Sequence, residues 1–226
     1  MIASSPTDLA RYIDHTLLRA DATRRDIEQL CAEARFHGFY AVCVHGSRIL
    51  QAAHFLEETD VKIAAVVGFP LGAGDTDIKR YETEVAIDHG AHEIDLVLNI
   101  GRLKDGEYEY VLRELHDVVE AADERPVKVI LECCYLTREE KVKACELVLE
   151  TGARFVKTST GFGPGGATVE DVQLLRELVG PEFGVKASGG IRDLATAQAM
   201  IAAGANRLGT SSGVAIVQGA PGQATY

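Results

Sequence analysis

The stretch that decides the fold is Phe155-Val-Lys157-Thr-Ser-Thr160-Gly161-Phe162, a short apolar strand that ends on a lysine and opens into a Thr/Ser/Gly turn. A core strand seldom ends on lysine, because burying an ammonium group without a partner is costly. The segment Gly184-Val-Lys186-Ala-Ser-Gly189-Gly190 repeats this design 29 residues later. Two strands that each end on a lysine predict one site with two amines, one of which could be a nucleophile.

Outward from this pair, the chain repeats a short β-type run, a Gly/Ser/Pro turn and a helical pattern. The predicted strands are Tyr12–Asp14, Ala41–Val44, Lys62–Val67, Glu93–Leu98, Val127–Leu131, Phe155–Lys157, Val185–Ala187 and Arg207–Gly209. Eight such units with parallel strands predict a (β/α)8 barrel. The alternative, an open doubly wound sheet, would more naturally carry a GxGxxG in its first turn, and the sequence has none there.

The predicted helices carry clear start and stop signals. The clearest helix has one apolar stripe from Tyr108 to Ala122. Thr137-Arg-Glu-Glu140 is a capping box, and Thr168-Val-Glu-Asp171 resembles one with aspartate in place of glutamate. Four glycines follow helical runs and precede strands, as C-terminal caps do; they are Gly38, Gly90, Gly152 and Gly204.

Composition limits the classes of protein that the chain can represent. Its 226 residues fit one barrel domain over 1–226 without a linker, ending in a tail at about 220–226 that we expect to be flexible. The net charge of −11 argues against nucleic acid or an anionic membrane as a partner. Lysine supplies only 8 of the 23 basic residues, which fits either adaptation to high salt or ordinary solubility.

Location can also be predicted. No apolar run approaches the roughly 18 residues that span a bilayer, and the first residues lack the pattern of a signal peptide. The five cysteines are an odd number without a CxxC pair. They argue against a disulfide framework and a zinc site, and favour a reducing cytoplasm.

Strand alternation predicts which side chains enter the barrel. In Glu93-Ile-Asp95-Leu-Val-Leu-Asn99, a period of two directs Glu93, Asp95, Val97 and Asn99 inward. The same alternation directs Lys157 and Lys186 inward. A buried structural ion pair is one interpretation of this convergence. Two lysines and one aspartate leave an excess of positive charge, which favours a functional site instead.

The predicted trio suits imine chemistry. Neighbouring strands lie roughly 4.8 Å apart, so two ammonium groups on adjacent strands would repel each other. Repulsion and desolvation both lower the pKa of an amine. A neutral amine can attack an aldehyde to form an imine, whose protonated form is an electron sink for cleavage of a carbon–carbon bond. Asp95 could shuttle the protons, which is the logic of a metal-free aldolase with no cofactor.

Two glycine-rich turns suit a phosphate group. Ser188-Gly189-Gly190 follows the seventh predicted strand, and Gly209-Thr-Ser211-Ser212-Gly213 follows the eighth. Loops after strands seven and eight of such barrels often bind phosphate. Backbone N–H groups and serine hydroxyls can hold the anion.

At this point the residues resemble a known family. Asp14-His-Thr16-Leu17, the Glu93–Gly101 segment, KTSTGF at 157–162, KASGGI at 186–191 and Gly209–Gly213 are similar to deoxyribose-phosphate aldolases, from about Tyr12 to Gly219. These are class I, Schiff-base enzymes. The resemblance implies reversible cleavage of 2-deoxy-D-ribose 5-phosphate to D-glyceraldehyde 3-phosphate and acetaldehyde. We also expect a homo-oligomer, a dimer or a tetramer.

The resemblance assigns roles to residues of this chain. Lys157 forms the Schiff base, Lys186 perturbs it, and Asp95 joins Lys186 in proton transfer. The residues expected to bind the substrate and its phosphate are Asp14, Thr160, Gly161, Gly189, Gly190, Gly209, Ser211 and Ser212. No metal is implied.

One departure and two rival functions stay open. Cys43-Val-His45-Gly46 stands where the family often has Cys-Val-Asn-Pro, so His45 either alters the pocket mouth or is a solvated loop histidine. The rival functions are a Schiff-base barrel aldolase for another phosphosugar and a phosphosugar-binding barrel without catalysis. A pure binder would not need Asp95 together with Lys157 and Lys186.

The last seven residues generate a prediction. Ala-Pro-Gly-Gln-Ala-Thr-Tyr226 can span at most about 23–25 Å, enough to fold over the barrel mouth. A phenol can relay a proton, so we hypothesise that Tyr226 assists protonation of the enamine carbon. Tyr226→Phe, or deletion of Tyr226, should slow exchange of the acetaldehyde methyl protons in heavy water several-fold while substrate binding holds. An unchanged NMR exchange rate would make Tyr226 an incidental end.

Overall fold

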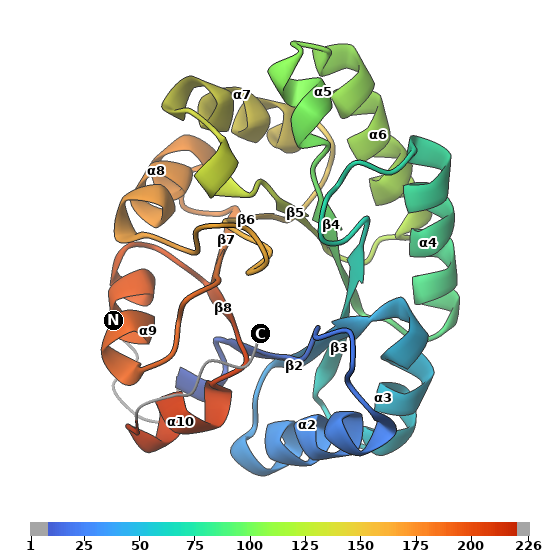
Figure 1. Ribbon diagram of the computed structural model, residues 1–226, viewed down its shortest axis with the longest axis vertical. Helices are drawn as coiled ribbons and strands as arrows, with labels where there is room; N and C mark the ends of the chain where they lie inside the picture. Colours follow the sequence, from blue (N-terminus) through green and yellow to red (C-terminus); the bar gives the residue numbers. More distant parts are fainter. Residues whose placement is uncertain (1–8, 221–226) are drawn as a thin grey trace.

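Eight parallel strands close into a barrel in the computed structural model, which describes residues 9–220, and helices surround that barrel (Figure 1). The fold predicted from the sequence is confirmed, and each predicted strand ends within two residues of the observed one. The strands are β1 (Ile13–Thr16), β2 (Ala41–His45), β3 (Lys62–Val67), β4 (Glu93–Val97), β5 (Val127–Ile130), β6 (Phe155–Lys157), β7 (Gly184–Ser188) and β8 (Arg207–Thr210). β1 pairs with both β2 and β8, which closes the sheet.

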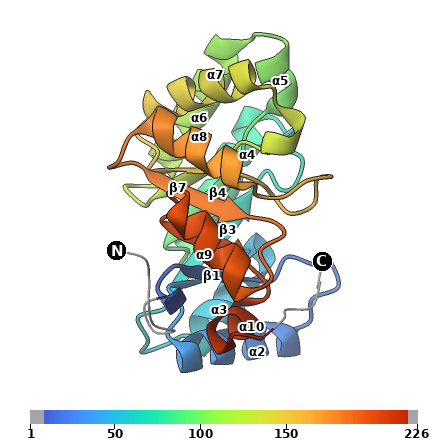
Figure 2. The same ribbon diagram turned by 90° about the vertical axis from the view of Figure 1, so that its left-hand side faces the viewer.

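Helices follow the strands and pack along the outside of the barrel (Figure 2). They are α2 (Arg24–His37), α3 (Ile49–Phe55), α4 (Thr76–Asp88), α5 (Ile100–Lys104), α6 (Tyr108–Ala121), α7 (Arg138–Leu149), α8 (Val169–Val179), α9 (Leu194–Ala202) and α10 (Gly213–Gln218). Short 3-10 turns occupy Gly46–Arg48 and Cys133–Tyr135. None of the helices in the described part of the chain is long and apolar enough to cross a membrane.

The predicted helix signals have their expected geometry. The Thr137 side chain accepts the Glu140 N–H while the Glu140 carboxylate accepts the Thr137 N–H, which is a complete capping box. Thr168 caps α8 by accepting from the Asp171 N–H. In α6 the predicted apolar stripe is buried at Val111, Leu115 and Val118. Tyr108, the first residue of the helix, is 41% exposed.

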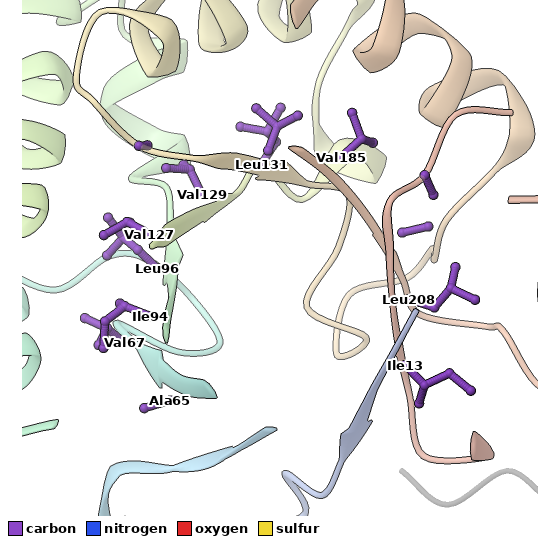
Figure 3. Close-up of a cluster of buried hydrophobic side chains, with 14 of the residues drawn as sticks. Ile13, Ala65, Val67, Ile94, Leu96, Val127, Val129, Leu131, Val185 and Leu208 are labelled. Atoms are coloured by element: carbon purple, nitrogen blue, oxygen red, sulfur yellow. The ribbon is translucent and has the colours of Figure 1, made fainter. Parts of the chain in front are cut away.

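Alternation along the strands divides their side chains between two environments. Outward-pointing residues such as Ile94, Val185 and Leu208 pack against the helices and form the main hydrophobic core (Figure 3). Val156 and Val185 lie in this core as predicted. Inside the barrel, a separate small cluster consists of Leu18, Cys43, Ala64 and Val66, with Phe69 against it. The interior beside β2 and β3 is therefore apolar.

One predicted orientation is wrong. β4 ends at Val97, so the alternation does not continue to Asn99. Asn99 instead caps α5, and its Oδ1 accepts the Arg102 N–H at 3.3 Å. The hypothesis about Tyr226 falls outside residues 9–220 and stays a prediction.

Candidate active site

Charged side chains fill the part of the barrel interior that the apolar cluster leaves. Six strands each direct at least one ionisable residue inward. Each of these residues is at most 6% exposed. They are Asp14 of β1, Glu93 and Asp95 of β4, Lys128 of β5, Lys157 of β6, Lys186 of β7 and Arg207 of β8. Lys157 and Lys186 face each other on adjacent strands, as predicted.

Asp95 is the branch point of this group. Its Oδ2 accepts hydrogen bonds from Lys157 Nζ and from Lys186 Nζ, both at 2.8 Å. Its Oδ1 accepts from Lys128 Nζ at 2.7 Å. One carboxylate thus accepts hydrogen bonds from three lysines. The two lysines predicted from the sequence, Lys157 and Lys186, share the same oxygen atom.

The remaining contacts close a ring. Lys186 Nζ donates to Asp14 Oδ2 at 2.5 Å, and Arg207 Nη1 donates to Asp14 Oδ1 at 3.0 Å. Arg207 Nη1 also donates to Glu93 Oε2 at 3.0 Å. Lys128 Nζ lies 2.7 Å from the same Glu93 oxygen, which leads back to Asp95. We call this alternating circuit of Asp95, Lys186, Asp14, Arg207, Glu93 and Lys128 the ion ring.

The ion ring is balanced without Lys157. Its three carboxylates match its three cations, and each cation contacts at least two carboxylates. Lys157 is attached to the ring only through Asp95 among the ion pairs of residues 9–220. A protonated Lys157 would therefore be a buried charge in excess of the available carboxylates, which is costly in the interior of a protein.

The pKa values follow from these contacts. Burial lowers the pKa of Lys157, and repulsion from Lys186 lowers it further, whereas Asp95 opposes both effects. Burial also acts to lower the pKa of Lys186, but attraction to Asp14 and Asp95 outweighs it, so that pKa is raised. The pKa values of two adjacent lysines are thus shifted in opposite directions. The shift favours the neutral amine at Lys157 and the ammonium at Lys186.

The carboxylates are held ionised by the same ring. Burial would raise the pKa of Asp14, but Lys186, Arg207 and Lys128 lower it to about 2. The pKa of Asp95 lies well below its usual value, because the attraction of three lysines exceeds the cost of burial. Asp14 was predicted to contact the substrate; the structure places it fully buried, with one oxygen on Lys186 and the other on Arg207.

Gly209 makes room for the ring. It pairs with Asp14 across the junction of β1 and β8. A Cβ at this position would lie 2.9 Å from Ser188 Cβ and 3.0 Å from Lys186 Cε. The absent side chain therefore lets Lys186 extend toward Asp14 and Asp95. This contact gives Gly209 a steric function in addition to the predicted part in substrate binding.

The two predicted phosphate turns lie side by side at the carboxyl ends of β7 and β8. Thr210 Oγ1 donates to Ile191 O at 2.7 Å, which joins the turns, and it accepts the Ser212 N–H at 2.9 Å. Gly189 and Gly190 have φ values of 83° and 80°, a region that glycine adopts readily. Within the described part of the chain, no heavy atom beyond its chain neighbours lies within 4 Å of where a Gly190 Cβ would be, which leaves room for a ligand beside this backbone.

Glu132 is a site residue that the sequence analysis did not identify. It follows β5, is 2% exposed, and has a φ of 54°, which is uncommon for a residue with a side chain. Its carboxylate accepts the Thr160 N–H at 3.2 Å and also accepts from the Thr160 hydroxyl. Glu132 thereby fixes the turn that contains Thr160 and Gly161, three residues beyond Lys157. The signal was present: an acidic residue just past a buried strand.

Aromatic rings lie in contact at the mouth of the barrel. His45 ends β2, where its Nε2 lies 3.0 Å from Leu18 O. The His45 ring contacts Phe69 with centroids 5.6 Å apart, and Phe69 contacts Phe162 at 5.2 Å. These contacts hold the His45 ring against Phe69, and the two interpretations offered for His45 both stay open.

A (β/α)8 barrel that buries a lysine of lowered pKa beside a lysine–aspartate pair has the groups that a Schiff-base aldolase needs. Comparison with known proteins agrees. The DeoC/LacD family aldolase description matches residues 9–219, and this chain belongs to that family.

Relatives of the chain are similar along nearly their whole length. The deoxyribose-phosphate aldolase of Thermococcus gammatolerans is 61% identical over 217 residues, which cover 94% of this chain and 96% of the relative. That of Alkaliphilus oremlandii is 58% identical over 211 residues, covering 93% and 95%. A solved structure, the tetrameric deoxyribose phosphate aldolase of Aeropyrum pernix, is 35% identical with a TM-score of 0.89, covering 95% of this chain and 91% of its own.

The ion ring generates a prediction about Lys128, a ring cation that contacts Asp95 Oδ1 while Lys157 contacts Asp95 Oδ2. Lys128→Met leaves three carboxylates and two cations in the ring, so a protonated Lys157 would restore the balance. The pKa of Lys157 should rise. Because only the neutral amine attacks an aldehyde, the acid limb of the pH profile of kcat/KM should then move to higher pH, by about one unit or more.

The matched control for this variant is Lys79→Met. Lys79 is also fully buried and bonded to a carboxylate, Glu114 at 2.7 Å, but it lies between α4 and α6 outside the ring. Both variants should unfold at lower urea concentration, and only Lys128→Met should move the limb. An unmoved limb in folded Lys128→Met would contradict the balance argument.

Proposed function

We propose that this chain is a class I aldolase that reversibly cleaves 2-deoxy-D-ribose 5-phosphate into D-glyceraldehyde 3-phosphate and acetaldehyde. The observation that carries the proposal is the attachment of Lys157 to an ion ring that is already neutral. The names of relatives at 54–61% identity support the choice of substrate. Those relatives are deoxyribose-phosphate aldolases.

The reaction begins at the amine of Lys157. Its lone pair attacks C1 of the open-chain sugar, the aldehyde oxygen takes up a proton, and loss of water gives a protonated imine. The C3 hydroxyl then gives up its proton and the C2–C3 bond breaks. The bonding electrons move through C2 to the imine nitrogen, which leaves a neutral enamine and releases glyceraldehyde 3-phosphate. Protonation of the enamine carbon and hydrolysis release acetaldehyde and restore the lysine.

Asp95 and Lys186 are the proposed proton carriers. Asp95 Oδ2 lies 2.8 Å from Lys157 Nζ, within the range that proton transfer requires directly or through one water molecule. Lys186 shares that oxygen atom and is an ammonium with protons to donate. Thr160, Gly161, Gly189, Gly190, Gly209, Ser211 and Ser212 are the proposed residues around the substrate and its phosphate.

The first test identifies the nucleophile. Borohydride with acetaldehyde, or with the sugar phosphate, should inactivate the enzyme and add mass to the peptide that contains Lys157. The added mass should be the same in Lys79→Met, whose missing amine lies outside the barrel. Labelling at Lys186 would exchange the two proposed roles. A protein that binds the sugar without being labelled would be the non-catalytic binder.

The second test concerns the phosphate turns. Ser212→Asp, or Gly190→Asp, places a negative charge where the phosphate is proposed to bind. KM should rise much more for deoxyribose 5-phosphate than for unphosphorylated deoxyribose, because only the former carries the repelled group. Steady-state kinetics on both sugars measures this. Equal losses on the two sugars would indicate damage to the fold and would remove the assignment.

Assembly and setting are further parts of this proposal. Ile78 and Tyr81 lie three residues apart on α4 and are 64% and 65% exposed, as expected of a surface that a second copy covers. We propose a homo-oligomer, a dimer or a tetramer, which light scattering after size exclusion would measure. Ile78→Glu should dissociate this oligomer, and a monomeric wild type would refute the proposal.

All five cysteines are free thiols, which supports a reducing, cytoplasmic setting. The main core runs from Leu9 to Ile216, which supports a single domain.

A further inference from the structure

A histidine outside the barrel interior lies against the second phosphate turn. His15 follows Asp14 on β1, so its ring points away from the barrel interior and lies between α2 and α10. His15 is 3% exposed. Its Nε2 lies 2.7 Å from the Glu33 Oε2 on α2, and its ring contacts Phe39 with centroids 5.0 Å apart. Figure 1 shows α2 and α10 as neighbours, and both helices contact β1.

The hydrogen bond to Glu33 fixes the protonation pattern of the ring. A carboxylate only accepts, so Nε2 of His15 carries the proton that it donates to Glu33. The same bond lowers the pKa of Glu33. Nδ1, at the other side of the ring, is buried and has no hydrogen-bond partner among residues 9–220. A buried polar atom left without a partner is unfavourable, so this ring is held in place for another reason.

The unpartnered side of the ring lies against the turn. A Cβ on Gly213 would come within 2.9 Å of His15 Nδ1 and 3.1 Å of Phe39 Cζ. Gly213 directly follows Ser211 and Ser212, and the backbone of His15 pairs with Thr210 just before them. The turn is therefore held at Ser212 by the Thr210 hydroxyl, which accepts the Ser212 N–H, and at Gly213 by the His15 ring.

There is space into which the turn could move if the ring were released. A cavity of about 200 Å³ lies on the outer side of β1, and Ser211, His15 and Glu33 all line it. Without the hydrogen bond to Glu33, the ring could rotate into this cavity and the turn could follow. The serines would then no longer be held where the phosphate needs them.

We propose that Glu33 and His15 are positioning residues that hold the Ser211–Gly213 turn in its phosphate-binding geometry. This inference rests on the phosphate assignment proposed above. Neither residue touches the substrate. Glu33 orients the ring, the ring supports Gly213, and the turn presents its N–H groups and hydroxyls to the anion.

The test compares two sugars in a set of variants. Glu33→Leu removes the acceptor and should raise KM for deoxyribose 5-phosphate about tenfold, which corresponds to about 1.4 kcal/mol. KM for deoxyribose and kcat for both sugars should stay within about twofold of wild type. The inhibition constant of inorganic phosphate should rise in parallel. Glu33→Gln keeps an oxygen acceptor for Nε2–H and should restore most of the affinity.

Two further variants protect the test against simple misfolding. Gly213→Ala pushes on the His15 ring from the other side, and should produce the same selective rise in KM without altering Glu33. Glu28→Leu removes the same charge from an exposed position of α2 and should have no effect on either sugar. Borohydride trapping with acetaldehyde, which needs no phosphate, should proceed normally in all of them.

The outcomes separate this inference from the proposed function. If Ser212→Asp discriminates between the sugars while Glu33→Leu and Gly213→Ala do not, the positioning role is refuted and the phosphate site stands. Equal losses on both sugars, or a Glu33→Gln variant as impaired as Glu33→Leu, would also refute it. If Ser212→Asp itself fails to discriminate, the phosphate site falls and this inference falls with it.

Discussion

The site depends on one electrostatic constraint: a closed interior can hold only as many cations as it has carboxylates. The ion ring satisfies this constraint by giving every carboxylate at least two cations and every cation at least two carboxylates. A buried ion pair contributes little to the free energy of folding. Removing one of its partners is strongly destabilising, because the other charge is left buried and unpaired. Arg207, which also lies over the Tyr40 ring at 3.5 Å, is thus as necessary to the balance as the lysines that were recognised from the sequence.

A closed sheet is the only part of this fold that can bring these charges together. Asp14 and Arg207 are 193 residues apart and bond to each other because β1 pairs with β8. Slipping any of these strands by one residue would turn its charged side chain toward the helices and its valine or leucine inward. The outward core of β4 to β8 therefore fixes the register on which the ring depends. Fold and site are specified by the same alternation.

Alternation also explains how far the sequence could predict this site. It placed Asp95, Lys157 and Lys186 inside the barrel, because each lies within a strand whose apolar neighbours mark the outward face. Applied to Val127–Leu131 it would have placed Lys128 there as well. The balance of the ring could not be predicted, since it depends on which oxygen atom each cation reaches. Glu132 and Asn99 lie beyond strand ends, where the period of two no longer holds and local backbone geometry decides.

The same balance bears on both halves of the proposed reaction. Burial and repulsion from Lys186 lower the pKa of the Lys157 amine before the substrate arrives. Conversion to a protonated imine restores the excess positive charge, because the nitrogen is now cationic and Asp95 is still shared with Lys128 and Lys186. Cleavage of the C2–C3 bond delivers two electrons to that nitrogen and gives a neutral enamine. In the proposed reaction, the charge excess that lowers the pKa of the amine is therefore the same excess that makes the imine a strong electron sink, and breaking the carbon–carbon bond relieves it.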